Sequence, residues 1–266
     1  MTYGAGDDGW RDFHERVDAL RPPQRPDAGV VARLTALIEG RDARILLLGV
    51  TRQLTGLGAD LTAVDQSREQ IERVWRGDGP CRRTLRADWR DMDLPRGHFT
   101  AAIGDGSLSA LAWPDDNACV LARVAGALAP GGRLAIRCYL APDEPEPLEQ
   151  VAEDVLEGRE ADFHATRWRV AMAACGPDGN VAVRDIFTAF ERIFPDREEL
   201  SARTGWPLET IAMVDPFRDS PLVYSFVTRS ALLAVLSGEF VNPRFVPSGD
   251  YPLAERCPFL VAERAG

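Results

Sequence analysis

The chain has 266 residues, enough to bury a large core, and its 45% hydrophobic and 27% charged residues are ordinary for a globular protein. Its formal net charge of -10 provides no basic surface of the kind that binds nucleic acid, so no DNA or RNA partner is expected. All 31 basic residues are arginine, which excludes chemistry that needs a lysine Schiff base and also excludes a P-loop of the usual form.

The cysteines and the first residues indicate the setting in which the protein works. Five scattered cysteines without a C-x-x-C spacing argue against a zinc site and against a disulfide framework. The start of the chain lacks a charged-then-apolar leader pattern, and no apolar run is long enough to span a membrane. We therefore expect a cytoplasmic protein without a metal ion and without a membrane partner.

The first predicted elements are two helices and two strands. Helical spacing predicts helices over Trp10–Leu20 and Val30–Ile38, which would either roof a ligand site or simply cover a sheet face. The apolar run Ile45–Leu48, closed by a glycine, predicts a strand buried on both faces of a parallel sheet. A polar turn and a short helix then lead to a second strand, Leu61–Val64, that ends on Asp65.

Helical and strand patterns alternate through the next part of the chain. Further helices are expected over Arg68–Trp75 and over Leu108–Leu128, the latter with a break at Trp113-Pro114. Further strands are expected over residues 82–85, 99–103 and 133–139. This alternation predicts a doubly wound α/β sheet with right-handed crossovers, in which ligands lie beyond the carboxyl ends of the strands.

The pattern changes after an acidic, proline-rich hinge at residues 142–147. Residues 147–215 are almost entirely helical in pattern, with helices expected over 148–156, 163–174, 181–194 and 197–204. This block is too long for a single crossover, so we expect a lid over the active site. The chain then returns to the sheet at 224–226 and adds a helix at 229–236 and strands near 240–246 and 259–262.

Asp65 is the most informative residue. A carboxylate at the end of the second strand of such a fold can accept both hydroxyls of a ribose. The alternative is an ordinary helix N-cap, in which Asp65 or Ser67 caps the helix that follows. The turn before it has a single glycine, Gly49, and would hold a pyrophosphate poorly, so dinucleotides are disfavoured against a nucleoside without phosphates, such as S-adenosylmethionine (SAM).

The order of motifs resembles a class I SAM-dependent methyltransferase over about residues 43–140 and the final hairpin. The resemblance rests on Leu46-Leu47-Leu48-Gly49-Val50, Val64-Asp65, Ala87-Asp88-Trp89, Ile103-Gly104-Asp105-Gly106-Ser107 and the helix-to-strand turn Leu128-Ala129-Pro130-Gly131-Gly132-Arg133-Leu134. The first motif departs from the family in lacking its second and third glycines. The resemblance implies SAM as the cofactor and a Rossmann-like, mostly parallel seven-stranded sheet with an antiparallel last strand.

The family also implies roles for individual residues. Asp65 would bind the ribose diol, Asp88 would accept the adenine amino group, and Trp89 would donate its backbone N–H to the adenine or flank the ring. Asp105 or Ser107 would lie beneath the sulfonium. In each case a structural alternative stays open, since the two later aspartates also suit turns and Trp89 suits a core. The expected cofactor contacts are Gly49, Val50, Thr51, Asp65, Gln66, Asp88, Trp89, Gly104, Asp105 and Ser107.

The helical segment 162–169 bears on the substrate. On a helix His164 and Trp168 share one face, as do Phe163 and Arg167. An imidazole could take a proton during methyl transfer, and Arg167 or Arg169 could clamp a carboxylate. The alternative is a solvated, charged helix face with Trp168 in the core. The expected catalytic residues are His164 and Asp105, and the expected substrate contacts are Phe163, Arg167, Trp168, Arg218 and Tyr224.

These patterns favour methyl transfer to a hydroxyl or amine of a small molecule, with an aromatic or carboxylate-bearing metabolite suggested by the arginines and aromatic residues of the lid. Two alternatives stay open: cyclisation or cleavage of SAM that releases methylthioadenosine, and a non-catalytic nucleoside-binding protein. The expected domains are N-terminal helices (1–40), a SAM-binding core (41–142), a helical substrate lid (143–220) and C-terminal strands that complete the core (221–266). The sequence predicts no oligomeric state.

Overall fold

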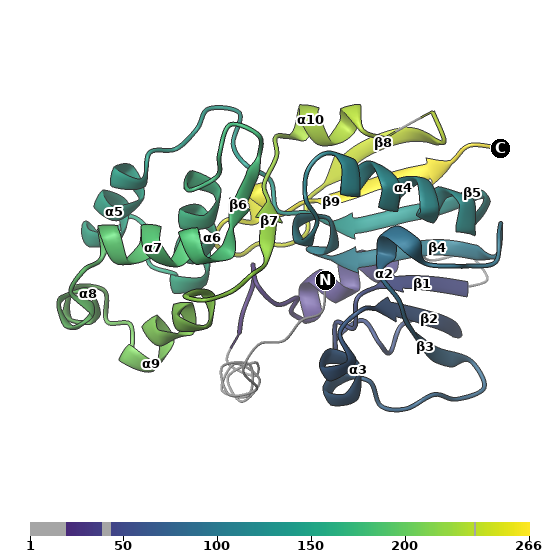
Figure 1. The fold of residues 1–266 in the computed structure, drawn as a ribbon, viewed down its shortest axis with the longest axis horizontal. Helices are drawn as coiled ribbons and strands as arrows, with labels where there is room; N and C mark the ends of the chain where they lie inside the picture. The colour runs from purple at the N-terminus through teal and green to yellow at the C-terminus, as the bar shows by residue number, and fades with distance from the viewer. Residues whose placement is uncertain (1–19, 39–43, 237) are drawn as a thin grey trace.

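The computed structural model describes residues 20–38, 44–236 and 238–266. Its main sheet consists of β1 (Arg44–Leu48), β2 (Asp60–Asp65), β3 (Arg82–Arg86), β4 (Phe99–Asp105), β5 (Leu128–Arg137), β8 (Phe240–Val246) and β9 (Phe259–Arg264). The strand order is β3-β2-β1-β4-β5-β9-β8, and Figure 1 shows this sheet beside a lobe of helices. The first five strands pair in parallel, and β9 runs antiparallel to both of its neighbours. The predicted seven-stranded, doubly wound sheet is therefore confirmed.

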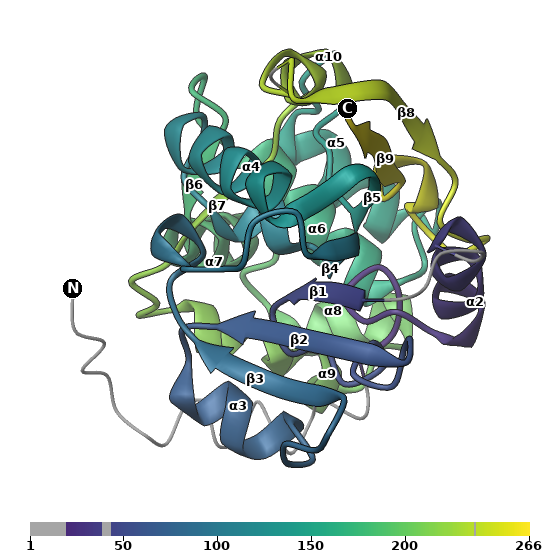
Figure 2. The ribbon, with the colours of Figure 1, turned by 90° about the vertical axis from the view of Figure 1, so that its right-hand side faces the viewer.

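Helices cover both faces of the sheet. One face packs against α2 (Ala28–Ile38) and α3 (Arg68–Val74), and the other packs against α4 (Asp115–Ala127) and α10 (Arg229–Ala234). Figure 2 shows α2 and α4 on opposite sides of the sheet. Alternate residues of β1 contribute to the two faces, so none of its four apolar side chains is exposed. That burial explains why the strand reads as an uninterrupted apolar run.

The helical block has a hydrophobic core of its own. It contains α5 (Leu148–Leu156), α6 (Phe163–Ala173), α7 (Val183–Ile193), α8 (Arg197–Thr204) and α9 (Leu208–Ile211). Aromatic and aliphatic side chains from these helices form a cluster that also includes Tyr139, at the end of β5. Figure 1 places the lobe beyond one end of the sheet, next to β5 and β9. The lid function expected of this block stays a prediction. Among the described residues, no helix is long and apolar enough to cross a membrane.

Three expectations about local structure need correction or lie outside the described residues. No helix joins β1 to β2, because residues 50–59 form successive turns that include Gly56 and Gly58. The predicted return to the sheet at residues 224–226 is wrong, since β7 (Val223–Ser225) pairs antiparallel with β6 (Asn180–Ala182) in a separate ladder. The predicted helix Trp10–Leu20 lies outside the described residues apart from its last residue.

Short 3-10 turns complete the chain and mark the strand ends that matter for the site. They are η2 (Trp89–Asp91), η3 (Ser107–Ala110), η4 (Ala212–Phe217) and η5 (Ala254–Arg256). The first two follow β3 and β4 directly. Since η3 ends before Trp113-Pro114 and α4 begins at Asp115, the predicted break in the helical pattern is confirmed.

Candidate cofactor and substrate site

The carboxyl ends of β1 to β5 meet at one edge of the sheet, because these strands are parallel. The Gly49 N–H donates to the carbonyl of Val64 at 2.8 Å, and the Ala87 N–H donates to the carbonyl of Asp65 at 3.1 Å. The predicted cofactor residues that follow β1, β2 and β3 are therefore neighbours in space. The register pairs Asp65 with Arg86, which puts Asp88 only two residues beyond it on the adjacent strand.

The Asp65 carboxylate is held by two backbone amides. Its Oδ1 accepts the Ser67 N–H at 2.8 Å, and its Oδ2 accepts the Val50 N–H at 3.3 Å. Burial raises the pKa of Asp65, and these two hydrogen bonds oppose the increase. Each carboxylate oxygen has a second lone pair, so the group can still accept two hydroxyls. The cap of the following helix is Ser67, which removes the alternative of Asp65 as that cap.

The space beside Asp65 depends on Gly49 and Trp89. Gly49 has a φ of +93°, a conformation that side chains disfavour, and a Cβ there would lie 3.6 Å from the Trp89 ring and 3.8 Å from the Asp65 carboxylate. The Trp89 indole N–H donates to the Val64 carbonyl at 2.6 Å, which fixes the ring beside the glycine. Asp65, Gly49 and Trp89 are thus neighbours at the carboxyl edge of the sheet.

The other predicted cofactor contacts have defined local roles. Asp88 caps η2 through the Arg90 N–H, and its carboxylate pairs with the Arg90 side chain, which lowers the pKa of Asp88. The Ser107 hydroxyl donates to the Leu48 carbonyl at 2.9 Å and joins the ends of β1 and β4. A Cβ at Gly104 would clash with the Ser107 hydroxyl, so the glycine leaves room for the bond from Ser107 to Leu48. Thr51 lies in the turn after β1, and Gln66 is exposed after β2.

Asp105 is paired inside the protein. Arg137, which has no solvent exposure, donates from Nε to the Asp105 carboxylate, whose side chain is 6% exposed. Arg137 also donates to the Tyr251 hydroxyl at 3.1 Å and to the Pro23 carbonyl at 2.8 Å. Burial raises the pKa of Asp105, and the charge of Arg137 opposes that increase. The ion pair thus fixes the end of β4 to β5, and Arg137 also ties both strands to the segment before α2. The Asp105 carboxylate is therefore occupied by its pair with Arg137.

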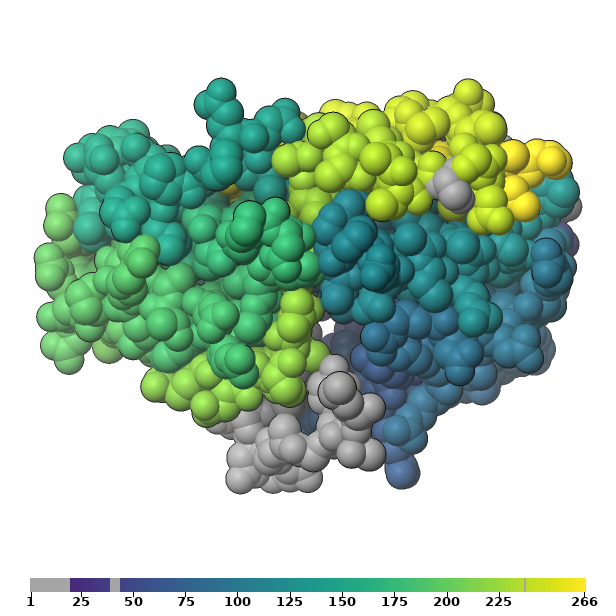
Figure 3. All heavy atoms as spheres, turned by 45° about the horizontal axis from the view of Figure 1, so that its top comes forward, coloured from purple at the N-terminus to yellow at the C-terminus, as the bar shows by residue number. Residues whose placement is uncertain are grey.

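Tyr139 connects the sheet edge to the helical lobe. Its hydroxyl donates to the Pro23 carbonyl at 2.9 Å, and its ring centroid lies 4.9 Å from that of Trp168 on α6. A Cβ at Gly106 would clash with the Tyr139 ring, and Gly106 has a φ of +68°. The glycine after β4 is therefore needed both for its backbone conformation and for the approach of Tyr139. Figure 3 shows a narrow opening between the two lobes, near the segment of β7.

Helix α6 is buried although its first two turns contain the polar residues His164, Thr166, Arg167 and Arg169. Every residue from Phe163 to Met172 is buried, and the Asp162 side chain caps the helix by accepting the Ala165 N–H at 2.8 Å. The alternative of a solvated, charged helix face is therefore wrong. Buried polar side chains require partners, because an unpaired one costs about 1–3 kcal/mol. The partners of His164, Arg167 and Arg169 separate these three residues into different roles.

His164 faces the segment before α2. Its Nδ1 lies 3.0 Å from the Gln24 side-chain oxygen, and the side chain is 6% exposed. With that oxygen as the acceptor, Nδ1 carries the ring proton and Nε2 keeps its lone pair. Burial, and then the charge of Arg167, lower the pKa of His164 to about 4. The imidazole is therefore neutral at neutral pH.

The two arginines of α6 differ in their partners. Arg169 forms ion pairs with Glu146 and Asp154, and Glu146 also accepts Arg256 at 2.9 Å, so Arg169 belongs to a structural network that ties the hinge to the lobe. Arg167 is 3% exposed and forms no ion pair with any acid among the described residues. Within the described ranges its hydrogen bond runs from Nη1 to the Met213 carbonyl at 2.7 Å, and its guanidinium lies 4.9 Å from the centroid of the Phe217 ring.

The remaining predicted substrate residues divide in the same way. Trp168 lies within 6.0 Å of Tyr224 and 4.9 Å of Tyr139, measured between ring centroids, and so faces the junction of the lobes. Phe163 packs edge-on against Phe190 and Trp206 in the core of the lobe. Arg218 is exposed, and its guanidinium lies 4.3 Å from the centroid of the Phe187 ring. The contacts of Phe163 and Arg218 are therefore structural.

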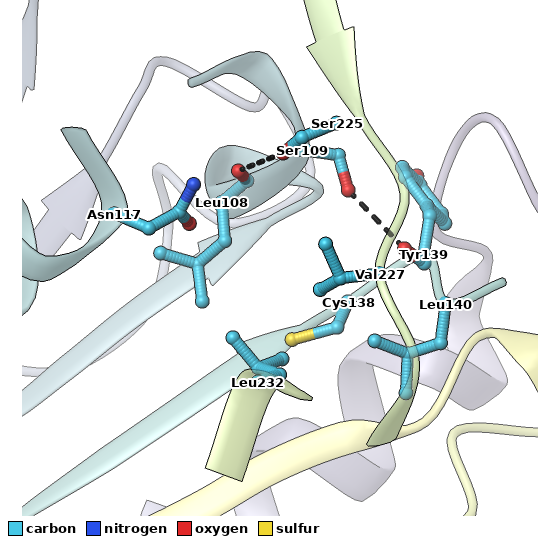
Figure 4. A pocket seen from close by; sticks show the side chains of 9 residues that line it. All are labelled: Leu108, Ser109, Asn117, Cys138, Tyr139, Leu140, Ser225, Val227 and Leu232. Carbon is cyan, nitrogen blue, oxygen red and sulfur yellow. Dashed lines mark hydrogen bonds between the residues drawn. The ribbon is translucent and has the colours of Figure 1, made fainter. Parts of the chain in front are cut away.

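A small pocket is lined by residues that follow β4 and β5 and by residues from the segment of β7 (Figure 4). Its volume of about 10 Å³ accommodates roughly one water molecule, far less than a nucleoside. The Ser109 hydroxyl donates to the Tyr139 carbonyl at 3.4 Å, and the Ser225 hydroxyl donates to the Leu108 carbonyl at 3.5 Å. The pocket is lined by Leu108, Ser109, Asn117, Cys138, Tyr139, Leu140, Ser225, Val227 and Leu232, and we assign it to packing between the lobe and the sheet.

Sequence reasoning missed Gln24, Arg137 and Tyr139. Arg137 stands in an otherwise apolar strand run, and a charged residue at such a position signals a buried partner. That signal was available from the sequence. Gln24 offered none, because it lies in a proline-rich segment that reads only as a helix breaker.

Comparison with known proteins places this geometry in a family. Residues 49–136 match the model of the methyltransferase domain, a range that holds all of the predicted cofactor contacts. This match and the fold identify residues 49–136 as a class I SAM-dependent methyltransferase domain, with SAM as its cofactor. No curated protein sequence matches the chain.

Solved structures share the fold at low sequence identity. A proposed Zn-dependent alcohol dehydrogenase from Rhodobacter sphaeroides is similar with a TM-score of 0.60 and 13% identity over 97% of each chain. The 1,6-didemethyltoxoflavin-N1-methyltransferase of Burkholderia thailandensis, solved with bound 1,6-didemethyltoxoflavin and S-adenosylhomocysteine, has a TM-score of 0.50 and 17% identity over 100% of this chain and 93% of its own. In the described part of the chain, no three His, Cys, Asp or Glu side chains are grouped as a metal site would require.

Proposed function

We propose that the protein transfers the methyl group of SAM to a hydroxyl or amine of a small molecule bound between the sheet edge and the helical lobe. The observation that carries this proposal is the position of α6. This helix, buried from Phe163 to Met172, presents Trp168 to Tyr139 at the carboxyl edge of the sheet, and His164 and Arg167 precede Trp168 in the same helix. A helix so placed would form a wall of the site for a second ligand beside the nucleoside.

The cofactor would be held mainly by the ends of β2 and β3. We assign Asp65 to the ribose hydroxyls, because its carboxylate keeps two free lone-pair positions. Trp89 would flank the adenine and Asp88 would accept its amino group, at the neighbouring strand end. Asp105 would support the site through its pair with Arg137 rather than act as a base, because its carboxylate is engaged and enclosed.

His164 would take the proton that the acceptor loses. SAM supplies an activated methyl group, so the main tasks of the protein are alignment and the exclusion of water. The neutral imidazole, with Nδ1 bonded to Gln24, can receive a proton at Nε2. A pKa of about 4 makes it a weak base in the free protein. An acceptor that masks the charge of Arg167 would raise that pKa toward the useful range.

Product analysis tests the reaction. The protein would be incubated with SAM and a mixture of aromatic hydroxy acids, amino acids and amines, and the products would be identified by mass spectrometry. S-Adenosylhomocysteine together with an acceptor heavier by one methyl group supports the proposal. Methylthioadenosine in place of S-adenosylhomocysteine would instead support cyclisation or cleavage of the cofactor.

A further inference from the structure

Three buried donors around α6 have no hydrogen-bond partner among the described residues. They are Arg167 Nε, Trp168 Nε1 and Gln24 Nε2. All three atoms donate hydrogen bonds and none accepts, so the unmet requirement of this region is for acceptor atoms. Folded proteins leave few buried polar groups unpaired, and such groups therefore call for an explanation.

The same side chains lie close to one another. Trp168 contacts Tyr139 and Tyr224 through its ring, while Phe217, which stacks with Arg167, lies 6.3 Å from Tyr224 between ring centroids. Gln24 is bonded to His164, whose ring shares a helix face with Trp168. The unpaired donors thus belong to side chains that are linked through one group of aromatic rings at the junction of the lobes.

Arg167 adds a charge to this region. Its guanidinium is buried and has no acidic partner among the described residues, in contrast to Arg169 two positions further along the helix. Burial lowers the pKa of Arg167 to about 10, which still leaves it charged at neutral pH. A buried unpaired charge is costly, and a bound anion would remove that cost.

We infer that the methyl acceptor is an aromatic compound with a carboxylate, which Arg167 binds while the rings of Trp168 and Tyr224 contact the aromatic part. This inference rests on the proposed function and specifies its substrate class. A planar carboxylate can accept two N–H groups from a guanidinium, and such charge-assisted bonds are about twice as strong as neutral ones. The indole N–H of Trp168 and the amide of Gln24 supply further donors to the acceptor.

Binding to matched probes tests the inference. The protein saturated with S-adenosylhomocysteine would be titrated with the three hydroxybenzoate isomers and with the three matching hydroxybenzamides, which keep the shape but lose the charge. We expect at least one hydroxybenzoate to bind about tenfold or more tightly than its amide. In Arg167→Gln and Arg167→Met this preference should disappear. In Arg192→Gln, which removes an exposed arginine of the same lobe, it should persist.

Stability of the ligand-free variants provides a second readout that needs no probe. If Arg167 is held for a ligand, Arg167→Met relieves a buried unpaired charge and should raise the urea midpoint of unfolding or leave it unchanged. If Arg167 is structural, the loss of its bond to Met213 should lower that midpoint clearly, and this result would overturn the inference. Equal affinity for acids and amides, or no binding of any acid at millimolar concentration, would also overturn it.

The outcomes separate the inference from the proposed function. If S-adenosylhomocysteine itself does not bind the wild-type protein, the proposed function fails. If it binds, and only the preference for carboxylates is missing, the inference about the substrate class fails alone.

Discussion

Replacing Arg137 with methionine should destabilise the protein strongly, because it leaves Asp105 buried without its counter-charge. The Arg137 side chain has no exposure, and it donates to Asp105, to the Pro23 carbonyl and to the hydroxyls of Tyr139 and Tyr251. Removing one partner of a buried, hydrogen-bonded ion pair costs about 3–5 kcal/mol. We therefore expect Arg137→Met to lower the free energy of unfolding by about that amount, as measured by urea denaturation monitored by fluorescence.

A double-mutant cycle separates the ion pair from the loss of packing. Adding Asp105→Asn to Arg137→Met removes the uncompensated charge, so the double variant should be more stable than Arg137→Met alone. The coupling energy should be about 2 kcal/mol or more. Arg192→Met, at an exposed ion pair, is the control and should change stability by less than about 1 kcal/mol. A loss below about 1 kcal/mol for Arg137→Met, or additive effects in the cycle, would refute the reasoning.

Three further predictions concern single residues. Gly106→Ala should lower the free energy of unfolding by about 2 kcal/mol or more, because Gly106 has a φ of +68° and an added Cβ would clash with Tyr139. The control Gly126→Ala in α4 meets no atom within 4 Å and should raise that free energy by up to about 1 kcal/mol. Equal urea midpoints for the two variants would contradict this. The pKa of His164 is depressed to about 4, so its contribution to the free energy of unfolding is complete above the unfolded pKa near 6.5 and is lost as the pH falls toward 4. His164→Gln should therefore reduce the loss of stability between about pH 7 and pH 5 by about 2 kcal/mol. A variant whose stability depends on pH as that of the wild type does would rule this out. Trp89→Phe should lower the free energy of unfolding by about 1 kcal/mol and weaken S-adenosylhomocysteine binding, since it removes the indole hydrogen bond to Val64. An affinity equal to that of the wild type, measured by calorimetry, would argue against a place for Trp89 beside the cofactor.

The sheet was predictable because its signals are local. The apolar run of β1 and the acid at the end of β2 each follow from the burial of one strand, and the strand order then follows from the family pattern. The missing helix after Gly49 and the pairing of Tyr224 with Val181 were not predictable in this way. The pairing of Tyr224 with Val181 joins segments that are far apart in the chain, and no local periodicity records it.

The site was predictable in part for the same reason. Asp65 and Asp88 follow neighbouring parallel strands, β2 and β3, whose carboxyl ends lie at the same edge of the sheet. The two aspartates could be located from the strand patterns alone. The partners of α6 come from distant segments: Gln24 meets His164, and Met213 meets Arg167. Arg167 and Arg169 look alike in the sequence, and only the tertiary contacts show that Arg169 is paired with acids while Arg167 is not.

Isothermal titration of S-adenosylhomocysteine into the wild-type protein and Asp65→Ala tests the central claim most directly. The matched control is Asp60→Ala, which removes an acid at the opposite end of the same strand. We predict that the wild type and the control bind with similar affinity, and that Asp65→Ala binds about a hundredfold or more weakly, because two charge-assisted hydrogen bonds of roughly 1.5–3 kcal/mol each are lost. Wild-type protein that does not bind, or an Asp65→Ala variant that binds as tightly as the wild type, would contradict the placement of the cofactor at this edge of the sheet.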